Sequence, residues 1–496
     1  MSEVRVTYSG LISFGIVMIT VITGLIFTLI VTRKLETEEF AIWSLIGSLI
    51  VYVMILDPIS SFWATRQIAR GEKVVGTAIG SSVIFAIIAT GIYQVIIYYI
   101  TITTDADYNI LLLTSLMIPL LYLSKEVKAV LSGFKPEGTS YGLLIFEVTK
   151  IPLGLIFVYW WDLGINGAIY TTILSQSASL IFYIYLIRSK LKEKFHFNYL
   201  KTWLKRFWLP LLHGNTDRLI HLDVTIYTTL VGSVTGLAYL GAARAIINGI
   251  SMTTYLSNGL YPKLVSGEKD EYIVMMFKRT FLFTIPILGM ALVFAKPGLW
   301  ILNPNYLESH IIVYSWVFVQ FAYVVETLLA SSLLGLENVD IQKHPKIKQF
   351  LKSNLFKVPM MDTIGRIFYI ILLIVLLPFI LESNSSDFYV IFWWGVIGIA
   401  ANLLIIGLYS KMIKKSINFK FPIKNMAKYV FVTIIASVPS FILVENYLVY
   451  EESIFDFLPI IFPFLLLYAS IYISLIYLWD KETRHLLKLI INEIKK

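Results

Sequence analysis

The sequence predicts an all-α membrane protein with about fourteen transmembrane helices. Apolar residues make up 57% of the 496 residues and charged residues 15%, whereas soluble domains average roughly 45–50% and about 25%. The apolar residues recur along the whole chain in segments of about 20, the length that crosses a bilayer as a helix. The chain has no cysteine, which excludes disulfides and thiolate metal sites.

The expected spans follow one another through short connections. They cover residues 9–32, 41–61, 74–101, 109–124, 140–160, 165–187, 207–232, 234–258, 280–301, 311–335, 360–381, 388–410, 428–448 and 456–479. The first span is too long for a removable signal peptide and lacks a small-residue cleavage site.

An amphipathic segment over 198–208 separates the first six spans from the next six. Its apolar residues fall on one helical face: Leu200, Trp203, Leu204 and Phe207. This pattern predicts a helix lying at the cytoplasmic membrane interface. We therefore expect a six-helix half over 1–197, a second six-helix half over 198–412, and two further spans with an amphipathic tail over 413–496.

The basic residues predict the orientation, because cytoplasmic loops carry an excess of Lys and Arg. With the N-terminus in the cytoplasm, 34 of the 41 basic residues lie in inner loops and three in outer loops, namely Arg33, Lys34 and Lys296. This asymmetry predicts a multi-pass protein of the cell membrane with both termini in the cytoplasm. It also accounts for the net charge of +9 without a nucleic-acid partner.

The sequence lacks the patterns of several enzyme classes. There is no G-x-x-x-x-G-K-[ST] or H-E-x-x-H motif, and the six histidines are scattered. These absences give no sign of ATP hydrolysis, of a metal site or of a cofactor. The expected outer loops are short, whereas an integral membrane enzyme usually needs a catalytic loop outside the bilayer. The sequence therefore favours a transporter over an enzyme.

Four segments resemble the polysaccharide (O-antigen type) flippases of the multidrug/oligosaccharidyl-lipid/polysaccharide exporter superfamily. They are "IVTRKLETEEFAIWSLIGSLI", through Arg33, Leu35, Glu38, Glu39, Phe40 and Ile42; "LDPISSFWATRQIARGE", through Asp57, Ala64 and Ala69; "WDLGINGAIYTTILSQ", through Gly164, Gly167 and Ala168; and "LAYLGAARAI", through Tyr239, Ala242 and Arg244. The resemblance covers about residues 10–410. Ile59 replaces a glycine of the second motif, and a basic insertion precedes the eleventh span.

This resemblance implies a flippase that moves a lipid-linked oligosaccharide or polysaccharide precursor, of the polyprenyl-phosphate type, across the membrane. Two six-helix halves would surround a central cavity and alternate in access, and we expect a monomer among membrane lipids. The alternative is a cation-coupled drug or metabolite exporter of the same superfamily. A membrane enzyme of polysaccharide synthesis, such as a polymerase, is a third reading that the short outer loops disfavour.

Charged residues inside the expected spans are the candidate site, because each costs roughly 2.5–3.5 kcal/mol to insert. The candidates for binding an anionic substrate in the cavity are Lys150, Arg218, Arg244, Arg366 and His221. Arginine suits phosphate through its planar, bidentate guanidinium. The candidate carriers of H⁺ or Na⁺ are Glu147, Asp217, Asp223 and Glu326. The competing hypothesis is that these groups only form ion pairs that hold the helices together.

Overall fold

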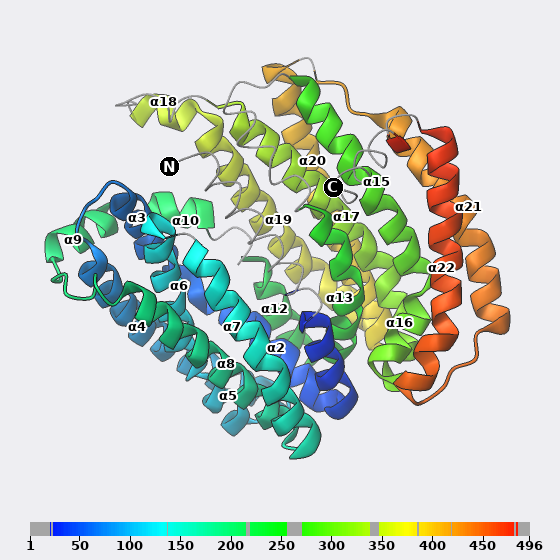
Figure 1. Ribbon diagram of the computed structural model, residues 1–496, viewed down its shortest axis with the longest axis horizontal. Coiled ribbons are helices and arrows are strands. Elements are labelled where there is room, and N and C mark those ends of the chain that lie inside the picture. Colours follow the sequence, from blue (N-terminus) through cyan, green and yellow to red (C-terminus); the bar gives the residue numbers. More distant parts are fainter. Residues whose placement is uncertain are drawn as a thin grey trace, which may run out of the picture. The chain divides into compact units, whose positions relative to one another are not determined.

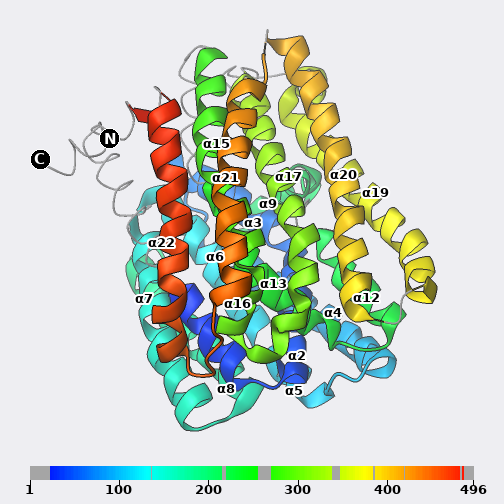
Figure 2. The ribbon, with the colours of Figure 1, turned by 90° about the vertical axis from the view of Figure 1, so that its right-hand side faces the viewer.

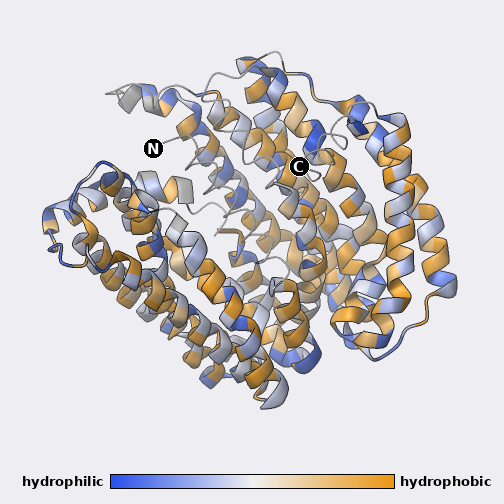
Figure 3. Cartoon of the chain, in the orientation of Figure 1, coloured by the Kyte–Doolittle hydropathy of each residue, from blue (hydrophilic) through white to orange (hydrophobic). Residues whose placement is uncertain are grey.

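The computed structural model describes residues 20, 23–135, 137–214, 219–254, 270–337, 347–383, 386–417, 419–480 and 483–484. These ranges contain helices and no strand (Figure 1). Eleven of the helices in the described ranges are long and apolar enough to cross a membrane. Hydrophobic residues run along the helices, and hydrophilic ones are more frequent in the connections (Figure 3). The chain is therefore a multi-pass membrane protein, as its composition predicts.

Residues 23–34 are helical, and the labelled elements follow them along the chain. They are α2 (Thr37–Val53), η1 (Met54–Leu56), α3 (Pro58–Ala69), α4 (Val75–Thr103), α5 (Tyr108–Thr114), α6 (Met117–Phe134), α7 (Glu137–Gly154), η2 (Leu155–Trp160), α8 (Gly164–Ile187), α9 (Phe197–Lys205), α10 (Trp208–Gly214), α12 (Leu222–Val231), α13 (Gly236–Met252), α15 (Asp270–Val293), α16 (Ala295–Leu302), η4 (Pro304–Ser309), α17 (His310–Gly335), α18 (Ile347–Lys352), α19 (Asn354–Ser383), α20 (Asp387–Ser416), α21 (Ile423–Tyr447) and α22 (Ile454–Trp479).

Three of the expected spans are not among the eleven. The span over 9–32 lies partly outside the described residues, and so does the end of the span over 234–258. The single helix expected over 207–232 is instead α10 and α12 in the described residues, with a turn at His221 and with 215–218 outside the description. The count of fourteen therefore stays a prediction.

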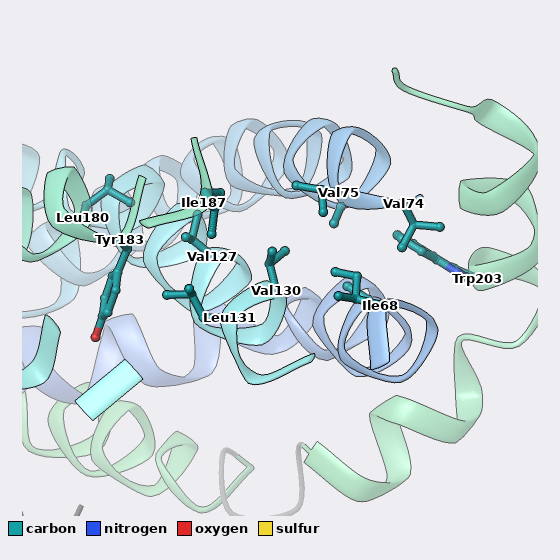
Figure 4. Packing of buried hydrophobic residues seen from close by; sticks show 12 residues of the cluster. Ile68, Val74, Val75, Val127, Val130, Leu131, Leu180, Tyr183, Ile187 and Trp203 are labelled. Atoms are coloured by element: carbon teal, nitrogen blue, oxygen red, sulfur yellow. The ribbon is translucent and has the colours of Figure 1, made fainter. Parts of the chain in front are cut away.

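The chain divides into two compact units. The first comprises Met1–Gly241 with Ile370–Leu381, and the second comprises Ala242–Tyr369 with Glu382–Lys496. One core cluster of the first unit joins α3, α4, α6, α8 and α9 (Figure 4). Its buried members include Ile68, Val75, Val130, Tyr183 and Trp203. Through Trp203, the amphipathic helix expected near 198–208 is anchored on the transmembrane bundle.

The second unit contains a close helix pair and a three-helix group. Gly395 of α20 lies so near Ser315 and Trp316 of α17 that an added Cβ would overlap both side chains. In the three-helix group, α21 packs against α15 and α22, and the three lie side by side in both ribbon views (Figure 2). The two C-terminal spans are thus integral to this unit.

Pro286 explains how α22 is attached to α15. Proline has no N–H, so the carbonyl of Leu282, four residues earlier, lacks its helical donor. The hydroxyl of Tyr472 on α22 donates to this carbonyl at 2.8 Å, and Tyr468 donates to the carbonyl of Pro286 at 2.7 Å. A bare carbonyl is costly in hydrocarbon, so Tyr472 makes the proline tolerable, and both tyrosines tie the helices together.

Candidate functional site

The first unit holds a buried ion pair on α7. The Nζ of Lys150 lies 2.6 Å from Oε2 of Glu147, the i, i+3 partner that the spacing predicts. The Thr23 hydroxyl donates to the same carboxylate oxygen at 2.6 Å. The ammonium also lies over the rings of Phe27 and Phe146, at 5.6 and 5.0 Å from their centroids. The Lys150 charge is thus held by a carboxylate and two aromatic faces.

A second buried acid of the first unit, Glu126 on α6, was not among the expected site residues. It is 1% exposed, and its Oε2 accepts a 2.5 Å hydrogen bond from Ser60 of α3. Its Oε1 is buried and has no hydrogen-bond partner. The neighbouring carboxylate of Asp57 lies 4.0 Å from the Nζ of Lys125. No cation among the described residues forms an ion pair with Glu126. This carboxyl group is therefore a buried acid without a counter-charge in the described part of the chain.

Arg366 of α19 is the centre of the corresponding cluster in the second unit. Its guanidinium forms an ion pair with Glu326 of α17 at 2.5 Å and donates to Asn402 of α20 at 2.7 Å. Its Nε lies 3.2 Å from Asp362, the i, i+4 partner on the same helix. Arg366, Glu326 and Asn402 are all buried. The cluster therefore brings one cation, two acids and one amide from three helices into one site.

Arg244 of α13 lies beside a chain of aromatic residues. Its guanidinium is 4.7 Å from the ring centroid of Trp316, a cation–π distance. Trp316 packs edge-on against Trp394, whose indole N–H donates to the Tyr369 hydroxyl at 2.7 Å. Arg244 is only partly buried, unlike Arg366. Among Lys150, Arg244 and Arg366, Arg244 is the one that is not fully buried.

The other expected site residues lie near the start of α12 or outside the description. Asp223 is buried in the first turn of α12, and His221 is partly buried just before it. Asp217 and Arg218 lie outside the described residues. The place of Asp217 and Arg218 in the expected cavity therefore remains an expectation.

Two of the motifs that carry the family resemblance meet in the first unit. Glu39 at the start of α2 accepts a hydrogen bond at 3.1 Å from the backbone N–H of Ile165 at the start of α8. Acidic groups are favoured at helix N-termini, which carry unsatisfied N–H donors. Gly164 precedes Ile165 with φ of +54°, and an added Cβ there would strike the Glu39 carboxylate. Glu39 of α2 therefore caps α8, the helix that begins in the segment "WDLGINGAIYTTILSQ".

The chemistry available in these clusters is ionic. Glu147 and Glu326 each neutralise a cation of a neighbouring or the same helix, and Glu126 sits without one. Among the described residues, no group of three His, Asp or Glu side chains is placed to hold a metal ion. The arrangement is suited to proton or cation exchange and to attraction of anions.

The fold is similar to those of several solved membrane transporters. A lipid II flippase MurJ in an inward closed conformation is similar with a TM-score of 0.63 and 15% identity, over 96% of this chain and 99% of that chain. An inward-facing MATE family multidrug resistance transporter of the MOP superfamily is similar with a TM-score of 0.55 and 14% identity, over 82% and 98%. A MATE structure in the straight conformation is similar with a TM-score of 0.52 and 14% identity, over 83% of this chain and 96% of that chain. No family model matches the chain, and no curated protein matches it in sequence. The expected likeness to this superfamily is confirmed at the level of the fold.

Proposed function

We propose that the chain is a flippase that translocates a lipid-linked oligosaccharide or polysaccharide precursor, carried on a polyprenyl phosphate, by alternating access. The supporting observation is the extent of its likeness to the lipid II flippase. The likeness covers 96% of the chain, so about 20 of the 496 residues lie outside it. This number is smaller than the 25 residues of α21 or the 26 residues of α22. Both C-terminal helices thus contribute to the match. The likeness to the inward-facing drug exporter covers only 82% of the chain.

The proposed membrane arrangement is the one that the sequence predicts. Fourteen spans are grouped as six-helix halves over 1–197 and 198–412, and two more spans follow over 413–496. Both termini lie in the cytoplasm of a cell-membrane protein that acts as a monomer among membrane lipids. The two halves alternate in opening a central cavity to either side.

Anionic substrate groups are proposed to meet the cations of that cavity. Arg244 and His221 are partly buried and accessible, and Arg218 joins them in this proposal. Lys150 and Arg366 are held by carboxylates in the described structure, so they become available only when those pairs open.

Ion coupling follows from the same pairs. A proton on Glu147 leaves Lys150 without its carboxylate partner, and a proton on Glu326 leaves Arg366 with Asp362 as its remaining acid. A buried cation that loses a counter-charge attracts an anion more strongly. Asp217 and Asp223 are the other proposed carriers of H⁺ or Na⁺. Glu126 is added to them because it is buried without a cation.

The test is reconstitution of the whole chain in proteoliposomes. A fluorescent polyprenyl-pyrophosphate oligosaccharide is supplied, and its exposure to an impermeant quencher is followed with H⁺ and Na⁺ gradients imposed or collapsed. We expect flipping that slows when one of the gradients is collapsed, and slower coupled flipping in Glu147→Gln and Glu326→Gln. Flipping no faster than in protein-free vesicles would overturn the proposal.

The alternative, a cation-coupled drug or metabolite exporter, is favoured by the MATE-like fold of the chain. The same vesicles distinguish it. Gradient-driven efflux of a cationic dye without any flipping of the sugar lipid would establish the alternative instead.

A further inference from the structure

A basic pocket lies in the first unit, outside the clusters described above. It has a volume of about 100 Å³ and lies between the C-terminal part of α3 and the amphipathic helix α9. The residues lining it are Trp63, Arg66, Gln67, Arg70, Thr202, Trp203 and Arg206. Three of the seven are arginines and none is acidic, so the pocket is strongly electropositive.

Packing of α9 fixes the shape of this pocket. Trp203 is 1% exposed within the core cluster (Figure 4), and its indole N–H donates to Oε1 of Gln67 at 3.0 Å. This anchor holds α9 against α3, and it brings Arg206, the C-cap of α9, to the pocket. Arg66 and Arg70 are four residues apart, so they lie on the same face of α3 and at its end. Ordinary anchoring by cytoplasmic cations does not require three of them to line one cavity.

Two of the three arginines and one indole of the pocket lack an acceptor among the described residues. The guanidinium of Arg66 lies 4.0 Å from the ring centroid of Phe62. In the described part of the chain, neither Arg70 nor Arg206 forms an ion pair, and both are exposed. The buried indole N–H of Trp63 has no hydrogen-bond acceptor there. A ligand rich in acceptor oxygens and negative charge would complement these groups.

The surroundings indicate where such a ligand comes from. Large apolar side chains remain exposed along the same segment, namely Phe197, Leu204, Phe207 and Trp208. An amphipathic helix with exposed Phe, Leu and Trp lies in the headgroup region of a bilayer, with these side chains inserted. Thr202, Trp203 and Arg206 of this segment line the pocket, so a segment at the membrane interface places the pocket near the lipid headgroups.

We propose that this pocket binds the headgroup phosphate of an anionic phospholipid. The planar fork of arginine matches phosphate oxygens bidentately. The volume is well below the roughly 300–1,000 Å³ of pockets that enclose drug-sized ligands, so it fits a phosphate group and not a sugar chain. With the proposed topology, the lipid belongs to the cytoplasmic leaflet. The site is distinct from the cavity proposed for transport, so either can be wrong without the other.

The test measures lipid retention by the purified whole chain in detergent, using native mass spectrometry. Phosphatidylglycerol is titrated against diacylglycerol, which lacks the phosphate, and inorganic phosphate is added as a competitor. The variant Arg70→Gln/Arg206→Gln removes two pocket cations. The matched control Lys201→Gln/Lys205→Gln removes two exposed cations of α9 that do not line the pocket.

We expect the pocket variant to bind phosphatidylglycerol about tenfold more weakly, or worse. The matched control should keep most of the affinity, diacylglycerol should not bind, and millimolar phosphate should not displace the lipid. Equal losses in the two variants would show diffuse surface charge, and displacement by inorganic phosphate would show a site for the free anion. Either result, or unchanged binding by the pocket variant, would overturn the proposal. The thermal midpoint of each variant checks folding.

Discussion

Arg366 illustrates how a buried cation in this protein is stabilised by several helices at once. Its contacts with Glu326, Asp362 and Asn402 come from α17, α19 and α20. Removing one partner of a buried ion pair leaves an uncompensated charge, at a cost of about 3–5 kcal/mol. By contrast, an exposed pair contributes about 0–1 kcal/mol.

We therefore predict that Arg366→Ala lowers the free energy of unfolding by about 3–5 kcal/mol. The double variant Arg366→Ala/Glu326→Gln should recover part of that loss, because one of the two stranded carboxylates becomes neutral. Unfolding in mixed detergent–lipid micelles, followed by circular dichroism, measures both effects. The control is Lys296→Ala, which breaks the exposed Lys296–Glu445 pair; its effect should stay within about 1 kcal/mol.

Transport separates a structural role of Arg366 from substrate binding. If the double variant regains stability and also transports normally, Arg366 acts only by pairing, and the proposed substrate contact is wrong. Restored stability with a loss of transport well beyond that of Glu326→Gln alone would support the contact.

At the scale of elements, hydropathy predicted most spans because a span needs only length and apolar composition. The helix expected over 74–101 is α4, Val75–Thr103, and the amphipathic segment expected over 198–208 is α9, Phe197–Lys205. The turn at His221 was not predicted, because the span was placed on the length and overall apolar content of 207–232 despite the charged residues near its middle. Local polar interactions, which hydropathy does not measure, decide where a helix stops.

The candidate clusters were predictable only along one helix. The pairs Glu147–Lys150 and Asp362–Arg366 follow from spacings of three and four residues. Their partners Thr23 and Asn402 come from distant parts of the chain, so they depend on how helices pack. Glu126 escaped notice because the expected span stopped at residue 124, whereas α6 continues to Phe134.

The attachment of α22 to α15 gives a prediction about Tyr472. Tyr472→Phe should lower the free energy of unfolding by about 1–3 kcal/mol, because the Leu282 carbonyl loses its donor. In a Pro286→Ala background the new N–H can serve this carbonyl, so the same substitution should cost clearly less. A double-mutant cycle measures the difference.

A matched control for that cycle is Tyr409→Phe. The Tyr409 hydroxyl also donates to a backbone carbonyl, that of Val358, but Asp362 four residues later retains an N–H that can serve this carbonyl. Tyr409→Phe should therefore lower the free energy of unfolding by less than Tyr472→Phe does. Equal costs of Tyr472→Phe with proline or alanine at 286 would contradict the account.

The end of α22 provides a dependence on pH. Burial raises the pKa of the Asp480 carboxyl, but a hydrogen bond from Thr483, the charge of Lys428 and a hydrogen bond from Tyr429 outweigh it, so the pKa lies below its usual value. An acid whose pKa is lowered by folding stabilises the fold at pH values above its unfolded pKa of about 3.9. This stabilisation is lost as the pH falls through the pKa of the folded state.

We accordingly expect the thermal midpoint of the wild type to lie above that of Asp480→Asn, by a margin that stays constant from about pH 7 to 5. The margin should shrink below about pH 4. Scanning fluorimetry over this range measures it. A margin that persisted undiminished at the lowest pH would rule out the carboxylate as its source.

For the whole molecule, the distribution of charge gives the orientation. The chain has no cysteine, so single cysteines report on topology without background. Ser453→Cys, in the exposed connection between α21 and α22, should react with an impermeant maleimide in intact cells. Ser416→Cys, at the end of α20, should react only after permeabilisation. Labelling of Ser416→Cys in intact cells would invert the orientation and the leaflet assigned to the basic pocket.

The proline in α15 also has a consequence for biosynthesis. Leu282 is made 190 residues before the tyrosine that satisfies its carbonyl. At about 5–20 residues per second, the interval is roughly 10–40 s. During that time α15 is in the membrane and the Leu282 carbonyl lacks a hydrogen-bond donor from the chain. Water, a chaperone or the insertion machinery must satisfy it. The last helix therefore supplies a hydrogen-bond donor that an earlier helix lacks. A chain whose synthesis stops before α22 keeps the Leu282 carbonyl without this donor, which is a defect that quality control recognises.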